Sequence, residues 1–502
     1  MLATAELPAP GMTSVPRPRW QSSPGLLATL LGAIATVTSL TLAWIPSFWG
    51  DEAASVMSAQ RSLASLFPML ANIDAVHGAY YLFLHFWIQV FGTSEFAVRL
   101  PSAIAVGIAT AGVVILVASM ADRRAPLIAG VVCAVLPRFT AMGAEARSYA
   151  FSTAIGVWLT VLLVLLLRRS ERRWMPWIGY SMLLAVGIYS FLYLGLVVLV
   201  HAAFVVIDQR ARAVRLRWVF SASVGMLLAA PIVMMAISER GQIAFLSRRA
   251  TASVERIVVT QWFGNVPLAI FGWALILLAV IFAVRHPRFK QSRLAVLAIL
   301  WLALPTAVVV AFSAVVMPIY SVRYLSMSAP AAAILVALGV SALARGQLWV
   351  RLCVLGLIVV LAFPIWMSQR GEFAKDGGSD WRQVSSFIGA EAVPGDGVYF
   401  DPTTKPSRRP RLALHLYPGD YAGLVDVALR VPFYAHPGLW DLLLPLSSAA
   451  PVIAAVSRIW VVDLRGSVGD TSSAQQSALA AQGFALAETT RLHRTTVYEY
   501  TR

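Results

Sequence analysis

The sequence predicts a polytopic α-helical membrane protein with a small C-terminal α/β domain. Three observations predict this class. First, 59% of the 502 residues are hydrophobic and only 13% are charged, whereas about a quarter of the residues in an ordinary soluble domain are charged. Second, the mean hydropathy is +0.73. Third, long apolar runs fill the chain up to residue 368, and beyond it prolines and charges become more frequent.

A membrane-spanning helix needs about 20 mostly apolar residues. Eleven segments have this character, so we expect about 11 transmembrane helices in a domain that spans residues 25–368. The segments cover residues 25–47, 99–120, 126–143, 149–167, 175–190, 192–207, 218–236, 267–284, 294–315, 326–344 and 352–368. The preceding residues 1–24 contain five prolines and are predicted to form a disordered cytoplasmic tail.

Basic residues lie mostly on one side of these spans. That side carries 18 lysines and arginines with four acids, and the other side of the membrane region carries nine with seven acids. Loops rich in Lys and Arg stay in the cytoplasm. We therefore expect a multi-pass membrane protein with a cytoplasmic N-terminus and with residues 369–502 outside. The net charge of +16 is then a topology signal and indicates no nucleic-acid partner.

The first outer loop, residues 48–98, is long and contains an aromatic apolar stretch at 80–91. This stretch is too short to cross a bilayer and is typical of a helix that lies in the membrane interface, in contact with lipid.

The extracytoplasmic domain, residues 369–502, shows short patterned elements. Helices are predicted over 380–390 and 473–482, and strands over 397–400, 459–463 and 495–500. The domain has no Gly-rich phosphate loop, no His/Cys cluster and no nucleophile elbow, so its sequence predicts no chemistry of its own.

Acidic residues on the outer side are the first candidates for chemistry. Asp51 and Glu52 are adjacent in Trp49-Gly-Asp-Glu52, where the first span ends. A carboxylate near the hydrocarbon boundary costs free energy, which favours a functional interpretation. The alternative is that both acids mark the water side of a helix end.

Four further motifs follow this acidic pair in a fixed order. They are Asp74-Ala-Val-His-Gly-Ala-Tyr-Tyr81, Phe91-Gly-Thr-Ser-Glu-Phe-Ala-Val-Arg-Leu-Pro-Ser102, Ala144-Glu-Ala-Arg-Ser-Tyr149 and Ser321-Val-Arg-Tyr-Leu325. Up to about residue 345, the set resembles the GT-C glycosyltransferases, in particular the protein O-mannosyltransferase, ArnT and RgtA/B/C/D-like branch. Many members have His-Pro-Pro before the tyrosines, whereas this chain has His77-Gly78-Ala79.

The resemblance implies transfer of a sugar from a polyprenyl-phosphate donor to a lipid, glycan or protein acceptor at the outer face of a bacterial plasma membrane. Mannose or another hexose is the favoured sugar by family association. Asp51 matches the family's catalytic base, and Glu52 is its companion. A hydroxyl acceptor loses a proton as it attacks the anomeric carbon, and a positioned carboxylate can accept that proton.

The leaving group in such a transfer is a phosphate, so a cation is needed and a general acid is not. Arg323, followed by Tyr324, is the leading candidate for binding the donor phosphate, and Arg147 is the second. The alternative for each arginine is a snorkelling side chain at the end of a span.

Other motif residues are candidates for shaping the site. His77, Asp74 and Tyr81 are predicted to bind the acceptor or to position other groups, with Asp74 orienting the His77 ring. Glu145 could pair with Arg147, or join Asp51 in binding a divalent ion such as Mg²⁺ or Mn²⁺. Some members of the superfamily use such an ion and others do not, and no other cofactor is implied.

Two other classes of function remain open at this stage. A lipid or solute transporter would also have many spans, but transporters place ionisable groups near the bilayer midplane and contain repeats of broken helices. A cell-wall-binding membrane scaffold would depend on residues 369–502 and would not need Asp51.

Overall fold

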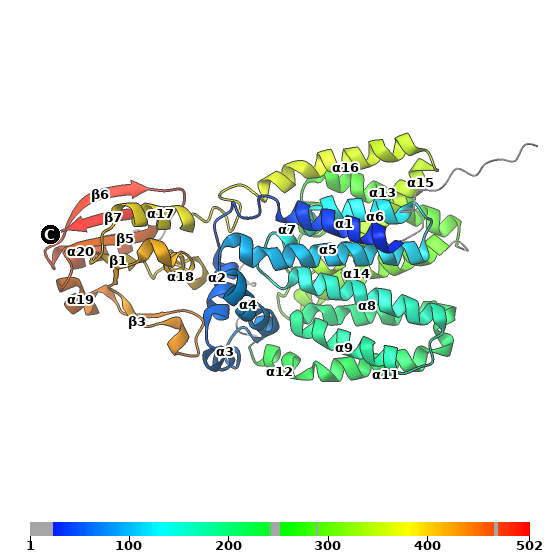
Figure 1. Ribbon diagram of the computed structural model, residues 1–502, viewed down its shortest axis with the longest axis horizontal. Coiled ribbons are helices and arrows are strands. Elements are labelled where there is room, and N and C mark those ends of the chain that lie inside the picture. The colour runs from blue at the N-terminus through cyan, green and yellow to red at the C-terminus, as the bar shows by residue number, and fades with distance from the viewer. Residues whose placement is uncertain (1–23, 240, 242–251, 288–289, 466–469) are drawn as a thin grey trace, which may run out of the picture.

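The computed structural model describes residues 24–239, 241, 252–287, 290–465 and 470–502. A long helical bundle, a layer of three shorter helices and a sheet domain follow one another along the molecule (Figure 1). This arrangement confirms the predicted fold class. The predicted disordered tail lies outside the described residues except for Pro24, where the first helix begins.

Helices occupy all eleven of the predicted spans. The bundle contains α1 (Pro24–Leu40), α5 (Glu95–Met120), α6 (Ala125–Val135), α7 (Pro137–Gly143), α8 (Tyr149–Arg169), α9 (Met175–Ser190), α10 (Val197–Ile207), α11 (Arg215–Leu228), α12 (Ala230–Ser238), α13 (Val266–Arg285), α14 (Lys290–Val315), α15 (Ala329–Ala344) and α16 (Leu348–Ser368). Within the described residues, six helices are long and apolar enough to cross a membrane, and two bent pairs raise this number to eight. The remaining predicted spans are shorter helices.

Two of the predicted spans are bent where a proline interrupts them. The axis turns by 57° between α6 and α7 and by 46° between α11 and α12. Pro137 begins α7 and Pro231 follows the break before α12. Proline lacks the N–H that would continue the helical hydrogen bonds, so the helix breaks there. The apolar run continues across the break, and for this reason the sequence predicts each pair as one span.

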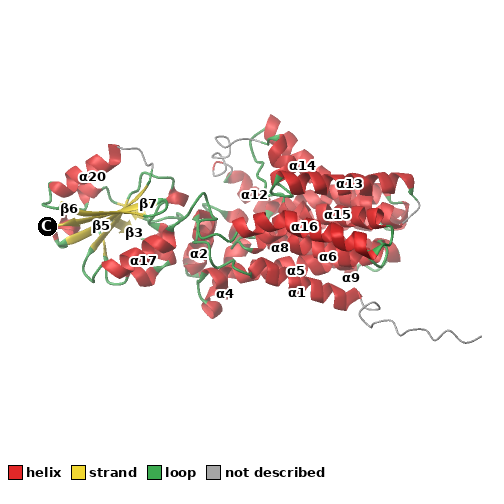
Figure 2. Cartoon of the chain, turned by 90° about the horizontal axis from the view of Figure 1, so that it is seen from above, coloured by secondary structure: helices red, strands yellow, loops and turns green. Residues whose placement is uncertain are grey.

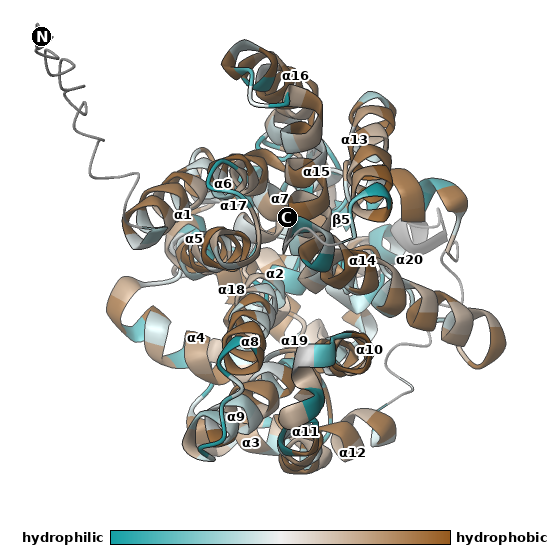
Figure 3. Cartoon of the chain, turned by 90° about the vertical axis from the view of Figure 1, so that its right-hand side faces the viewer, coloured by the Kyte–Doolittle hydropathy of each residue, from teal (hydrophilic) through white to brown (hydrophobic). Residues whose placement is uncertain are grey.

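Helix ends at the far end of the bundle are tied together by basic side chains. Arg168 donates a hydrogen bond to the carbonyl of Ser119 at 2.7 Å, and Arg124 donates one to the carbonyl of Gly346 at 3.1 Å. The predicted cytoplasmic loops therefore share one end, opposite the sheet domain (Figure 1). Between these ends the helices are predominantly hydrophobic (Figure 3).

The layer between bundle and sheet is the first outer loop. It contains α2 (Gly50–Gln60), α3 (Leu63–Leu70) and α4 (Gly78–Phe91), and α4 confirms the helix predicted over 80–91. Phe86, Val90 and Phe91 are exposed on α4, as expected of a helix in contact with lipid headgroups.

The C-terminal domain is a five-stranded mixed sheet with the strand order β2-β1-β5-β7-β6. Its strands are β1 (Gly397–Phe400), β2 (Val425–Asp426), β5 (Arg458–Leu464), β6 (Ala485–Arg491) and β7 (Thr495–Thr501), and β3 (Leu429–Val431) pairs with β4 (Leu442–Leu443) in a separate ribbon. Strand β1 is parallel to β2 and β5, whereas β7 is antiparallel to β5 and β6.

Helices cover both faces of this sheet (Figure 2). The domain contains α17 (Trp381–Glu391), α18 (Leu412–Leu416), α19 (Ala450–Ala454) and α20 (Asp470–Ala480). Side chains alternate along a strand, so Phe400 packs with Trp381 of α17, whereas Tyr399 packs in the cluster that holds Leu479 of α20. The core on the α17 side continues into Met57 of α2, which joins the sheet domain to the layer above the bundle.

A partly buried ion pair also fixes this junction. Arg382 of α17 bonds Glu95 of α5 at 2.5 Å, and Tyr417 donates a hydrogen bond to the same carboxylate at 2.5 Å. The sheet domain is thereby anchored to the first residue of a membrane helix.

Candidate active site

Asp51 and Glu52 lie in the first turn of α2, which begins at Gly50. The N-terminus of a helix stabilises nearby negative charge through its dipole. Neighbouring residues of a helix point about 100° apart, so the two carboxylates leave α2 in different directions. Asp51 lines a cavity, whereas Glu52 is completely buried.

The cavity has a volume of about 870 Å³ and lies between the outer end of the bundle and the sheet domain. Six of the residues predicted from the sequence line it, namely Asp51, Asp74, His77, Arg147, Arg323 and Tyr324. The motifs that carry them are up to 273 positions apart in the sequence, and the fold places them around one space.

Two arginines surround the Asp51 carboxylate. Arg323 Nη1 donates a hydrogen bond to Asp51 Oδ2 at 2.8 Å, and Arg147 Nη2 lies 3.8 Å from Oδ1. Burial opposes ionisation of Asp51, but Arg323 and Arg147 outweigh it and hold the pKa of the carboxyl below its usual value. The carboxylate is therefore ionised at neutral pH, although 26% of its side chain remains exposed to the cavity.

Arg323 is itself held from several sides. Its Nη1 also lies 3.1 Å from Glu145 Oε1, and its guanidinium carbon lies 4.8 Å from the centre of the Trp49 ring. A cation over an indole face is stabilised by the ring quadrupole. The two carboxylates and the indole together fix the guanidinium at the cavity wall.

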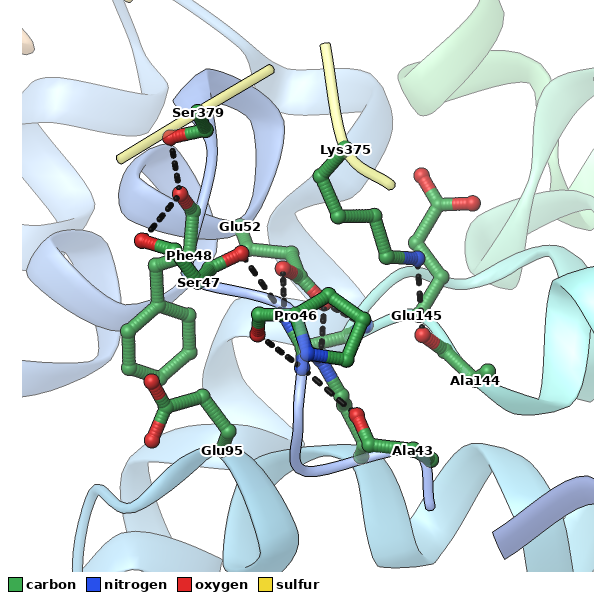
Figure 4. Close-up of polar contacts among 12 residues, drawn as sticks. Ala43, Pro46, Ser47, Phe48, Glu52, Glu95, Ala144, Glu145, Lys375 and Ser379 are labelled. Atoms are coloured by element: carbon green, nitrogen blue, oxygen red, sulfur yellow. Dashed lines mark hydrogen bonds and ion pairs between the residues drawn. The ribbon is translucent and has the colours of Figure 1, made fainter. Parts of the chain in front are cut away.

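Glu52 does not line the cavity. Its carboxylate receives two hydrogen bonds from Arg99 of α5, at 2.7 and 2.5 Å, and one from the Ala146 N–H at 3.0 Å. Arg99 also bonds the carbonyls of Ala43 and Pro46 (Figure 4). Both carboxylate oxygens accept hydrogen bonds, so Glu52 links α2 to α5 and to the turn that contains Ala146. It cannot contact a substrate in the cavity.

A second set of hydrogen bonds positions Arg147 at the cavity wall. Tyr81 donates a hydrogen bond to Asp74 and accepts one from Arg147 Nη1 at 3.0 Å. Asp74 has the left-handed backbone φ of 65°, which short polar residues tolerate better than most. Asp74 thus orients Arg147 through Tyr81, a contact that the sequence did not predict.

His77 packs against Phe191, with ring centres 6.0 Å apart and the planes within 17°. Burial and the nearby Arg147 lower its pKa to about 4. Within the described part of the chain, its Nδ1 atom is buried and has no hydrogen-bond partner. The imidazole is therefore neutral at physiological pH and keeps one unused polar atom at the cavity wall.

Sequence reasoning missed Lys375, which lies in the segment between α16 and α17. Its Nζ donates a hydrogen bond to the Ala144 carbonyl at 2.8 Å (Figure 4). Burial lowers the pKa of Lys375, and the nearby carboxylates of Glu52 and Glu145 oppose that shift. Nothing in the local sequence marks this lysine, because its partners lie more than 200 positions earlier.

The sequence assigns no role to Arg99, and it leaves open whether the C-terminal domain holds the acceptor, covers the mouth of the active site or only aids folding. Arg99 lies inside the second quoted motif, where a charge within an apolar span is itself a signal. The outer wall of the cavity carries side chains of the C-terminal domain, among them Asp376, Lys405, Arg408, Leu439 and Trp440.

A divalent ion does not fit the carboxylates of this site. Arg323 Nη1 already bonds both Asp51 and Glu145, so a guanidinium occupies the place between the two predicted ligands. In the described part of the chain, no three His, Cys, Asp or Glu side chains form a group that could hold a metal. Because Mg²⁺ and related ions need several oxygen ligands, the predicted Asp51–Glu145 metal pair is not supported by the geometry.

Comparison with known proteins adds a family match over part of the chain. Residues 79–235 match the model of a family described as dolichyl-phosphate-mannose-protein mannosyltransferase. This region begins at the tyrosine motif and ends in α12. No curated protein matches the chain.

Solved structures with the same architecture cover nearly the whole chain. ArnT from Cupriavidus metallidurans bound to undecaprenyl phosphate is 14% identical, with a TM-score of 0.60, over 94% of this chain and 97% of that chain. The oligosaccharyltransferase of Archaeoglobus fulgidus, in complex with Zn and sulfate, is 13% identical, with a TM-score of 0.50, over 86% of this chain and 68% of that chain. The chain therefore has the fold of the GT-C glycosyltransferases, and the resemblance to that superfamily seen in its motifs is confirmed.

Proposed function

We propose that this protein is a membrane glycosyltransferase that moves a sugar from a polyprenyl-phosphate donor to a lipid, glycan or protein acceptor outside the plasma membrane. The observation that carries the proposal is the contact between the Asp51 carboxylate and the Arg323 guanidinium at the wall of one large cavity. Mannose or another hexose is the first donor sugar to test.

The reaction needs a base and a phosphate-binding cation close together. An acceptor hydroxyl attacks the anomeric carbon, its proton passes to Asp51, and the bond from that carbon to the phosphate oxygen breaks. Arg323 and Arg147 stabilise the charge on the departing phosphate. The phosphate competes with Asp51 for Arg323, so donor binding weakens the ion pair and makes the carboxylate a stronger base.

The lipid part of the donor needs an apolar path to this site. One flank of the cavity is formed by α12 and the end of α14, and it carries Val233, Ala236, Ile237, Phe312 and Val316. Ile237 and Val316 are also exposed. We infer that the polyprenyl chain reaches Arg323 laterally between these two helices.

The comparisons support a lipid-phosphate donor in general terms. ArnT from Cupriavidus metallidurans has been solved with undecaprenyl phosphate, and the matched family is described by a dolichyl-phosphate-mannose donor. The ionisable residues of this site gather at the outer end of the bundle, where an acceptor from outside can reach them, and this favours a transferase over a transporter. In this proposal the N-terminus is cytoplasmic and residues 369–502 are extracytoplasmic.

A transfer assay with the purified full-length protein tests the proposal. Radiolabelled undecaprenyl-phosphate hexoses serve as donors, with mannose first, and membranes from a deletion strain supply the unmodified acceptor. We expect label in the acceptor from a lipid-linked donor and none from a nucleotide sugar.

Ala236→Trp supplies a further arm of this test, because an indole would fill the apolar flank. It should reduce transfer from a long-chain donor far more than from a short-chain analogue. Val219→Trp is the matched control, since Val219 is an exposed apolar residue of α11 outside the cavity. The absence of transfer from every lipid-linked donor contradicts the proposal.

A further inference from the structure

The outer wall of the cavity is formed by the sheet domain. The part of this wall that lies against α2 is the turn formed by residues 405–408. Strand β1 ends at Phe400, and the chain then runs back toward the bundle. Lys405, Ser407 and Arg408 of this turn line the cavity, and so does Trp440 from a separate loop. The cavity is therefore closed by two domains, although the sequence places all its recognisable motifs in one.

The 405–408 turn lies directly on the first residue of α2. A Cβ atom added to Gly50 would lie 2.0 Å from the Ser407 carbonyl oxygen, far inside van der Waals contact. Only glycine permits this approach, and Gly50 immediately precedes the proposed base, Asp51. The turn is thus part of the wall around the reacting groups.

The two cations of this turn differ in their surroundings. Arg408 Nη2 bonds Asp376 Oδ1 at 2.6 Å, so its charge is compensated within the protein. Lys405 is exposed and lines the cavity, and its side chain makes no hydrogen bond or ion pair with any residue that the structure describes. Its ammonium group is the cation of the outer wall that remains available to a bound molecule.

We propose that Lys405 and Trp440 form the acceptor subsite, with Lys405 binding an anionic group of the acceptor, a carboxylate or a phosphate. The half-buried Trp440 offers a flat apolar face beside it. This inference rests on the proposed function and specifies the acceptor as an anionic glycan or glycolipid.

The position of Lys405 assigns it to the acceptor. The donor phosphate is attached to a polyprenyl chain that stays in the membrane, and the cations at the membrane side of the cavity are Arg323 and Arg147. Lys405 approaches from the opposite domain, which is the side from which an extracytoplasmic acceptor arrives. Charge on the acceptor and charge on the donor are thereby recognised on different walls.

Lys405→Glu tests this subsite in the full-length protein, with Lys405→Arg as the conservative variant. Arg430→Glu is the matched control, because Arg430 is an exposed cation of β3 in the same domain that does not line the cavity. The assay uses labelled undecaprenyl-phosphate sugar and membranes from the deletion strain. It measures the amount of acceptor membrane that gives half the maximal rate, the KM for the donor and the Kd for undecaprenyl phosphate.

We expect K405E to raise the required amount of acceptor membrane about tenfold or more, since a charge-assisted contact becomes a repulsion. The donor KM and the Kd for undecaprenyl phosphate should be unchanged, and K405R should behave like the wild type. Equal acceptor requirements in K405E and R430E would overturn the inference, and so would weaker undecaprenyl phosphate binding in K405E. These outcomes leave the proposed function intact, whereas a wild-type protein that transfers no sugar contradicts both.

Discussion

Arg323 lies 2.8 Å from the carboxylate of Asp51, although 272 positions separate the two residues in the chain. The same guanidinium nitrogen lies 3.1 Å from Glu145. A cation that bonds the proposed base in this way links two tasks of the reaction, because whatever binds Arg323 also changes the proton affinity of Asp51.

Arg323→Ala should therefore change both donor binding and the pH dependence of transfer. Loss of a charge-assisted contact should weaken undecaprenyl phosphate binding by about tenfold or more. Arg323 lowers the pKa of Asp51, so its removal raises that pKa, and the acid limb of the rate profile moves to higher pH. Rates measured from pH 4 to 8 test this, with Arg430→Ala as the control. An unmoved acid limb would argue against Asp51 as the base.

Replacement of Glu52 should lower the stability of the folded protein, because Glu52 pairs with a buried arginine and does not line the cavity. Glu52→Ala leaves Arg99 buried without its partner, which costs about 3–5 kcal/mol of folding free energy for a buried pair. The exposed Glu391 is a matched control, and Glu391→Ala should leave thermal unfolding in detergent unchanged. The double variant E52A/R99A should lose less stability than the sum of the single variants. Additive losses would mean that the two residues act independently.

Lys375 should act on the reaction as a positioning residue. It holds the Ala144 carbonyl while Glu52 holds the Ala146 N–H, so the turn that presents Glu145 and Arg147 is fixed from two sides. Lys375→Met should lower the transfer rate and also weaken undecaprenyl phosphate binding, because the turn carries Arg147, and Lys375→Arg should restore part of both. A parallel loss of binding and rate, with no rescue by arginine, would indicate a general loss of structure instead.

His77 should make the folded state sensitive to acid. Burial lowers its pKa to about 4, below the ordinary value of 6.5. Between these two pH values the unfolded chain binds a proton that the native state does not, so stability is lost as the pH falls from 6.5 toward 4. His77→Gln should flatten the dependence of Tm on pH in this window. An identical slope in the variant would show that His77 does not titrate as proposed.

Much of the bundle could be predicted because hydropathy depends on local sequence. Each of the eleven predicted spans contains helix. The strand predicted over 459–463 lies in the centre of the sheet, where an apolar run is expected. Strand β6 was missed because almost all of its side chains are exposed at the sheet edge, which leaves no apolar pattern to detect.

The site was predictable only in part, for a related reason. Asp51, Arg147 and Arg323 lie in recognisable motifs, but the different directions of Asp51 and Glu52 follow from helix geometry and from Arg99, which no local pattern reveals. Lys375 bonds Ala144, which lies more than 200 positions earlier, and Lys405 lines the cavity from the domain that carries none of the motifs, so no local pattern links either lysine to the site. The motifs predict the residues that line the cavity from the bundle, and they do not predict the residues that line it from the sheet domain.

The most direct measurement is the initial rate of sugar transfer by Asp51→Asn at saturating donor, together with its Kd for undecaprenyl phosphate. Asparagine keeps the size of the side chain but cannot accept the proton. The assignment of Asp51 as the base predicts a rate loss of about 10²–10⁴-fold, the range for removal of a general base, with the lipid phosphate bound no more weakly than by the wild type. Transfer by Asp51→Asn at the wild-type rate would contradict it.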